Sequence, residues 1–403
     1  MVRRLRRLLS GEVASLTAAG LVGAISTFVF WLVAARRAPL LLIGHTTSVV
    51  VAGSVINAVS SFGLTVGLLR EKAHGGLHRS TLRAGLVLST TGSAIVSVVA
   101  LALWPSSSLD ALHFTNSTLY VHLLGLSGGL ALSVVIDTVA AGFGLPRLAI
   151  VRNLTVLVLR IVTVLTLHDL TCSHLLYAFW LPMVVTTLCA LPVLWRRGDL
   201  HPTATASPGR ALRESLRAWP TSLVFNAVAM VPPLVVTVVN GPAEGAVFYL
   251  LWNTALLANS LIGAWTSLGL RENSPLPQRR SRVMSILEMA VVWGVATVTV
   301  VVGVVAVVAY GAEYRQLGLA AAPLIGLGIV PYGILQFRVL ALRRHGQHRR
   351  AAMITASLLT LWMVGLLIVH PTSLVDVALW WCGAGVVALI VSSPRSVQRH
   401  STV

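Results

Sequence analysis

Twelve apolar stretches, each long enough to cross a membrane, occupy most of the chain. A helix rises about 1.5 Å per residue, so about 20 residues cross a hydrocarbon core of ~30 Å. The charged fraction of 10% and the mean hydropathy of +0.84 exclude an ordinary soluble protein, in which about 25% of residues are charged. We therefore predict an all-α polytopic membrane protein with transmembrane helices at about 13–35, 41–69, 84–104, 119–144, 148–167, 174–195, 218–239, 245–269, 283–309, 317–341, 351–369 and 373–392.

The basic residues orient these helices. Of the 30 lysines and arginines, 26 flank alternate loops and both termini, whereas the opposite side holds only Arg36, Arg37 and Arg315. Cytoplasmic loops carry the excess of basic residues, so both termini are predicted to be cytoplasmic and the protein to lie in the plasma membrane. The net charge of +18 then indicates attraction to anionic membrane lipids and no nucleic-acid partner.

A linker divides the chain into two halves. Residues 196–217 (RRGDLHPTATASPGRALRESLR) are rich in Pro, Ser, Thr and Arg, and they separate an N-terminal half, 1–195, from a C-terminal half, 218–403. Each half contains six of the predicted helices. We predict two six-helix bundles around a central cavity.

The second helix of each half ends in a similar sequence, SSFGLTVGLLRE at 60–71 and IGAWTSLGLRE at 262–272. Asn57 and Asn259 correspond within these helices after a one-residue slip. Because both halves start on the same side, such a repeat is related by an axis along the membrane normal.

Polar side chains recur on one face of the same two helices. The second span carries Thr47, Ser54, Ser61 and Thr65, and the eighth carries Trp252, Asn259 and Thr266. Polar residues inside a bilayer face protein or water, so these stripes are consistent with a cavity between the halves. Hydrogen bonds between packed helices are the alternative explanation.

Two charged residues lie deep within predicted spans. Arg160 is in the middle of the fifth helix, with Asn153 seven residues earlier on the same face, and Asp137 is in the inner half of the fourth. Arg160 either pairs with Asp137 or provides the cation for an anionic substrate. Snorkelling towards the membrane surface explains the charges nearer the helix ends, which are Arg152, Glu288, Arg338 and Asp376.

Several smaller features complete the pattern. Prolines interrupt the seventh helix at Pro220, Pro232 and Pro233, and the spacing of Gly125 and Gly129 predicts close helix packing. The three cysteines show no metal-ligand spacing, and we predict neither a metal site nor a cofactor.

Twelve helices in a 6 + 6 division, a proline-broken seventh helix and the Leu-Arg-Glu endings of helices two and eight resemble the multidrug/oligosaccharidyl-lipid/polysaccharide exporter superfamily. Within it, the chain is most similar to the flippases that move lipid-linked oligosaccharides in polysaccharide biosynthesis. The basic N-terminal segment, the Ser/Gly-dotted first helix and the Ala-Arg-Arg turn at 35–37 carry this likeness.

The resemblance implies alternating access around a cationic cavity, with the pyrophosphate of a lipid-linked glycan bound by arginine. It points to Arg160 as the main cation, with Arg70 and Arg271 either at the inner mouth or serving only as ordinary cytoplasmic arginines that follow the positive-inside rule. Asn57, Asn153 and Asn259, on the polar faces described above, are the other predicted substrate-binding residues. Membrane lipids, and glycosyltransferases or a polymerase of the same pathway, are the implied partners.

Two other functions stay open. An ion-coupled exporter of a drug or small metabolite in the same superfamily needs a carboxylate in the membrane, and Asp137 fits that role. A membrane glycosyltransferase is a distant third, since its first outer loop would need acidic residues and residues 36–40 contain none. We therefore expect a transporter and not an enzyme.

Overall fold

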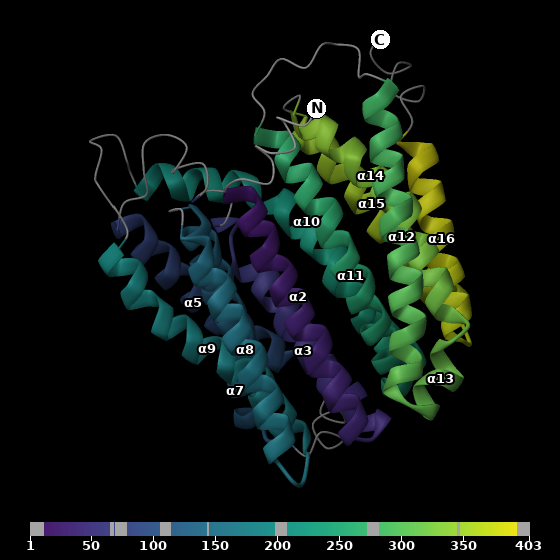
Figure 1. Cartoon of the computed structure of the whole chain (residues 1–403), viewed down its shortest axis with the longest axis horizontal. Coiled ribbons are helices and arrows are strands. Elements are labelled where there is room, and N and C mark those ends of the chain that lie inside the picture. The colour runs from purple at the N-terminus through teal and green to yellow at the C-terminus, as the bar shows by residue number, and fades with distance from the viewer. Residues whose placement is uncertain are drawn as a thin grey trace. The chain divides into compact units, whose positions relative to one another are not determined.

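The structure is a computed structural model of the 403-residue chain, and it describes residues 12–64, 68, 79–104, 114–142, 145–197, 208–271, 282–344 and 347–392. Within these residues every regular element is a helix, which confirms the all-α prediction (Figure 1). The helices pack as two compact units, Met1–Val231 and Pro232–Val403.

The first unit contains six long helices and the start of a seventh. They are α2 (Glu12–Arg37), α3 (Leu40–Ser60), α5 (Arg79–Ala102), α7 (Asn116–Gly142), α8 (Pro146–Thr166), α9 (Cys172–Arg197) and α10 (Pro208–Asn240). The second unit continues from α10 with α11 (Pro242–Arg271), α12 (Arg282–Tyr310), α13 (Ala312–Gly318), α14 (Ala321–Arg344), α15 (His348–Val369) and α16 (Leu374–Val391).

Eleven of the described helices are long and apolar enough to cross a membrane. The remaining predicted span, 245–269, lies on α11, which is helical throughout but is not one of these eleven. The protein is therefore a multi-pass membrane protein with two helical bundles. The central cavity and the exact bounds of the two halves stay predictions, since the division between the compact units falls inside α10.

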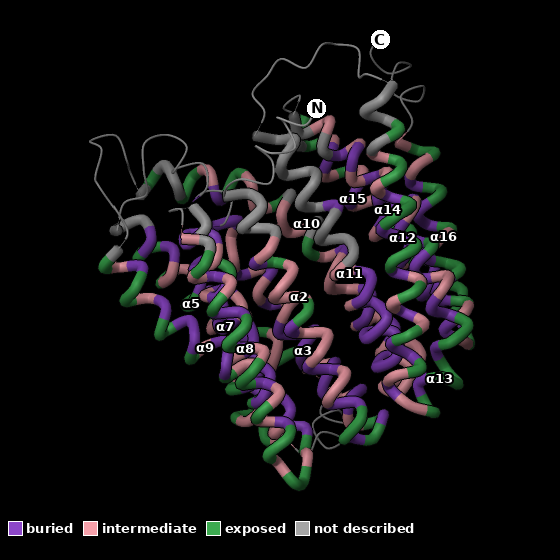
Figure 2. Tube along the Cα trace, in the orientation of Figure 1, coloured by how far each residue is buried: buried purple, intermediate pink, exposed green. Residues whose placement is uncertain are grey.

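The outer faces of the helices expose apolar side chains. On α12, Val298, Val301, Val305 and Val308 recur every three or four residues and are each at least half exposed. Figure 2 shows such exposed residues alternating with buried ones along single helices. Burying this surface in lipid removes it from water, which is the main force that would hold such helices in a bilayer.

Close packing holds the first unit together. α7 packs against α3, α5, α8 and α9, and α2 packs along α8. At Gly125 a Cβ would lie 2.6 Å from the ring of Trp180 on α9, so only glycine allows this approach. The small-residue contact predicted for Gly125 is thus confirmed.

An aromatic cluster forms the core of the second unit. Phe248 and Trp252 of α11 pack with Trp362 of α15 and Trp381 of α16, with ring centroids 4.8–6.3 Å apart. The polar-stripe residue Trp252 is part of this cluster and is buried.

The predicted second span, 41–69, is interrupted in the structure. Helix α3 ends at Ser60, and the chain then turns through Phe62 and Gly63, which have φ angles of 46° and 68°. This left-handed backbone cannot continue a right-handed helix. The apolar composition of the segment did not indicate the break.

Candidate functional site

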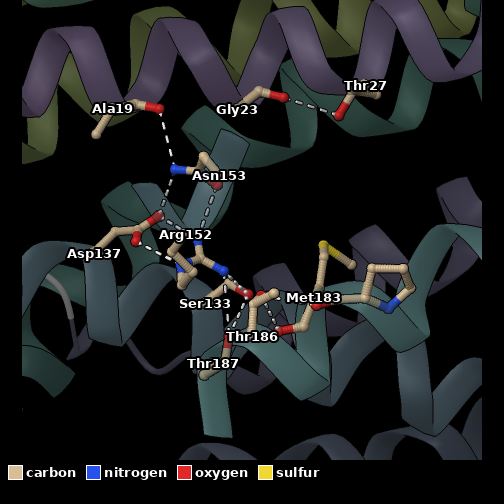
Figure 3. A network of polar contacts seen from close by, with 11 residues as sticks. Ala19, Gly23, Thr27, Ser133, Asp137, Arg152, Asn153, Met183, Thr186 and Thr187 are labelled. Carbon is tan, nitrogen blue, oxygen red and sulfur yellow. Dashed lines mark hydrogen bonds and ion pairs between the residues drawn. The ribbon is translucent and has the colours of Figure 1, made fainter. Parts of the chain in front are cut away.

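An ion pair lies inside the first unit. Arg152 of α8 donates from Nε to Oδ1 of Asp137 at 2.9 Å and from Nη2 to Oδ2 of the same carboxylate (Figure 3). The Arg152 side chain is 3% exposed and that of Asp137 is 23% exposed. Two parallel hydrogen bonds match the planar guanidinium to the carboxylate, which fixes both side chains.

Two hydroxyl groups complete the set of acceptors around Arg152. Its Nη1 donates to Ser133 Oγ at 3.0 Å and to Thr187 Oγ1 at 3.2 Å, and these two hydroxyls are 3.1 Å apart. Ser133 lies one turn before Asp137 on α7, and Thr187 is on α9. The cation is therefore held by three helices, α7, α8 and α9.

Asn153 extends this network to a fourth helix. Its Oδ1 accepts from Arg152 Nη2 at 3.0 Å, while its Nδ2 donates to Asp137 Oδ2 and to the Ala19 carbonyl of α2, both at 3.2 Å. Gly23 faces the same amide, because a Cβ there would lie 3.6 Å from Asn153 Oδ1. The bond to the Ala19 carbonyl therefore connects the network to the backbone of α2.

Arg160 forms a second polar centre two turns further along α8. It is 2% exposed, and its Nε donates to Phe179 O at 2.9 Å while Nη1 reaches Thr27 Oγ1 at 3.4 Å. Its guanidinium carbon lies 4.0 Å from the centroid of the Phe179 ring and 5.7 Å from that of Phe30. Stacking on aromatic rings stabilises a guanidinium that has left water.

Pro182 lies one turn from the carbonyl that Arg160 binds. This proline is inside α9 and has no N–H to donate to Ala178 O, so one helical hydrogen bond is missing at this turn. Phe179 O is the next carbonyl and accepts from Arg160. Arg160 therefore joins α8 to α9 and to α2.

Asp137, which was one of two alternatives for Arg160, binds Arg152 instead. The prediction that Arg152 snorkels is wrong, because its side chain is buried inside the bundle. The short connection between α7 and α8 could have predicted this pair from the sequence. Asp137 and Arg152 lie about one and a half turns from the facing ends of α7 and α8, which places them at the same depth.

The other predicted site residues are only partly described. Asn57 lies on α3, where its Oδ1 is buried and has no hydrogen-bond partner among the described residues. Asn259 and Arg271 lie on α11, but their side chains are outside the described residues, as is the whole of Arg70. The structure therefore brings together Asn153 and Asp137 and places Arg160 on the same helix as Asn153.

Hydroxyl groups of the predicted stripe on the second span bond within their own helix. Thr47 donates to Gly44 O at 3.0 Å, and Ser54 donates to Val50 O at 2.9 Å. Ser133 and Thr187, which sequence reasoning missed, bond to Arg152 instead. Among the described residues, no group of three or more His, Cys, Asp and Glu residues is arranged to hold a metal ion.

No protein-family model matches the sequence, and no curated protein matches it either. The structure is similar to solved transporters over nearly its full length. An outward-facing multidrug resistance MATE family transporter of the MOP superfamily has a TM-score of 0.64 at 16% identity, covering 98% of this chain and 97% of that one. An inward-facing structure of such a transporter gives 0.61 at 14% identity, covering 96% of each chain.

A MOP superfamily transporter from Pyrococcus furiosus has a TM-score of 0.59 at 14% identity, with 98% and 97% of the two chains covered. That protein is described as having a binding pocket of reversed polarity that suggests a different function. This chain therefore has the fold of the MATE transporters of the MOP superfamily.

Proposed function

We propose that this protein is a MOP-superfamily transporter that flips a lipid-linked oligosaccharide, or a related polysaccharide precursor, across the plasma membrane by alternating access. The fold supports a transport role, because similar chains have been solved in outward-facing and inward-facing conformations. The flippase assignment rests on the sequence resemblance and on the chemistry of Arg160.

Arg160 is the observation that carries the proposal. A charged side chain at mid-membrane costs at least ~2.5–3.5 kcal/mol on insertion scales, so it marks a functional site by default. Its guanidinium offers a planar set of donors that suits phosphate oxygens. The contacts to Phe179 O and Thr27 Oγ1 hold this group in one orientation inside the bundle.

The ion pair of Asp137 with Arg152 supports the same assignment. Asp137 is the carboxylate that was considered as a structural partner for Arg160. It makes two hydrogen bonds to Arg152 instead. In this proposal the pyrophosphate of the substrate reaches Arg160 when the helices around it move. The polyprenyl tail stays in lipid during the crossing.

The test is transport by purified protein in liposomes. A fluorescent lipid-linked oligosaccharide is placed in both leaflets, and its protection from a membrane-impermeant quencher reports flipping. We expect faster flipping with the protein than in empty liposomes. Flipping at the rate of empty liposomes by folded protein would contradict the proposal.

An ion-coupled exporter of a drug or metabolite is the second candidate, and the Asp137 network favours it. Protons or cations that bind Asp137 would compete with Arg152 and Asn153, and Asn153 in turn bonds to the backbone of α2. Ion binding could thus be coupled to a helix movement. Drug efflux driven by a proton or sodium gradient, and abolished in Asp137→Asn, would favour this function over the flippase.

A further inference from the structure

The turn after α3 holds a residue other than glycine in a left-handed backbone conformation. Ser61 N–H makes the last helical bond, to Asn57 O at 2.9 Å, and Leu64 N–H then donates back to Ser61 O at 2.9 Å. Between them Phe62 has a φ of 46°, in the left-handed region. A residue other than glycine held there costs of order 1–3 kcal/mol and persists only where its surroundings enforce it.

Trp219 of α10 contacts this turn through a hydrogen bond and a ring contact. Its indole Nε1 donates to Val59 O at 3.0 Å, and its ring lies against Phe62 with centroids 5.5 Å apart. In an uninterrupted helix the same carbonyl would accept from Gly63 N–H, four residues later. Trp219 therefore occupies the carbonyl oxygen that a continuous helix would use.

The backbones meet closely at this point. A Cβ on Gly63 would lie 2.5 Å from Ser215 O and 3.1 Å from Trp219 N, so α10 rests directly on the turn. Ser215 is 1% exposed as a result. The Phe62 ring also fills the space above Gly92 of α5, where a Cβ would lie 2.7 Å from its Cε2.

We propose that these contacts form a two-state latch, made of Trp219 and Ser215 on α10 and of Val59, Phe62 and Gly63 after α3. In the closed state, seen here, Trp219 holds Val59 O and the chain turns at Phe62. In the open state Gly63 N–H donates to Val59 O and helix α3 continues through residues 61–63. The start of α10 then separates from this segment. This equilibrium belongs to the fold and does not depend on which substrate the protein carries.

Two measurements on the full-length protein in detergent test the latch. A Ser215→Cys reporter, with Cys172, Cys189 and Cys382 replaced by alanine, measures access to the contact through its rate of maleimide labelling. Hydrogen exchange of the Phe62 and Gly63 amides measures whether the helix continues. The variants are Trp219→Phe, Trp219→Ala and Gly63→Ala, and Trp293→Phe on the exposed face of α12 is the matched control.

Opening of the latch moves the two readouts in opposite directions. Loss of the indole hydrogen bond in Trp219→Phe should raise the labelling rate about fivefold, since one such bond contributes ~1 kcal/mol. Trp219→Ala and Gly63→Ala should raise it further, and in all three variants the Phe62 and Gly63 amides should exchange more slowly because they enter a helix. Trp293→Phe should leave both readouts unchanged.

Two outcomes would overturn the proposal. Faster labelling together with faster amide exchange would mean that the turn unfolds locally and has no helical second state. Unchanged labelling in both Trp219→Ala and Gly63→Ala would mean that Trp219 does not hold the contact. A thermal melt of each variant identifies global unfolding, and the mild Trp219→Phe change keeps the test valid if the larger substitutions do not fold.

Discussion

Arg152 Nε lies 2.9 Å from Asp137 Oδ1, and this ion pair ties α8 to α7 inside the first unit. The pair does more than neutralise two charges. Through Asn153 it reaches the backbone of α2, and through Ser133 and Thr187 it reaches α9. Four helices thus share one polar network at a depth where unpaired polar groups are costly.

Replacing one partner of this ion pair should destabilise the protein more than replacing both partners. Asp137→Asn or Arg152→Met alone leaves a buried polar group without its partner and should cost about 3–5 kcal/mol, whereas the double variant should recover part of that loss. Thermal unfolding in detergent measures the effect. Glu214→Gln is the control, because Glu214 pairs with the exposed Arg217 and surface pairs contribute only ~0–1 kcal/mol. A double variant no more stable than the sum of the single changes would argue against this coupling.

Two glycines on α7 provide a matched packing test. A Cβ at Gly125 would lie 2.6 Å from the Trp180 ring, whereas at Gly128 no atom lies within 4 Å. Gly125→Ala should lower stability by about 1–3 kcal/mol through overpacking. Gly128→Ala should be neutral or stabilising by up to ~1 kcal/mol, since alanine favours the helix. Equal melting temperatures for the two variants would contradict the packing described for α7 and α9.

The sequence predicted the positions of the helices well, because a bilayer demands about 20 apolar residues for each span. It also placed Arg160 deep in its helix, since depth follows from position along a span. It did not predict that Phe179 O binds Arg160 or that Arg152 binds Asp137. Those contacts depend on how each helix is rotated and which neighbour it faces, and hydropathy carries little of that information.

The break after Ser60 shows that sequence-based prediction has the same limit for the backbone. Gly63 permits a left-handed turn, but glycine is also common inside membrane helices. The turn contacts Trp219, whose indole donates to Val59 O from 160 positions further along the chain. Local sequence therefore could not distinguish a continuous second helix from a broken one.

The orientation of the helices gives a further prediction. Single cysteines at Thr205 and Gly346 should be labelled only from the cytoplasmic side, and cysteines at Ser107 and Pro242 only from outside, because basic loops stay in the cytoplasm. Impermeant maleimide on intact cells and on inverted vesicles makes the comparison. Labelling of the Thr205→Cys variant in intact cells would contradict the predicted topology.

Binding of the substrate phosphate by Arg160 is tested most directly by the flipping of a labelled lipid-linked oligosaccharide by Arg160 variants. Arg160→Ala should reduce the flipping rate by roughly 10-fold to 100-fold, the loss expected for charge-assisted hydrogen bonds of ~1.5–3 kcal/mol. Arg160→Lys keeps the charge but loses the planar donors, so it should be impaired less. Arg315→Ala, at an exposed position on α13, should flip at the parental rate. Parental flipping by Arg160→Ala protein with a normal melting temperature would remove Arg160 from the mechanism.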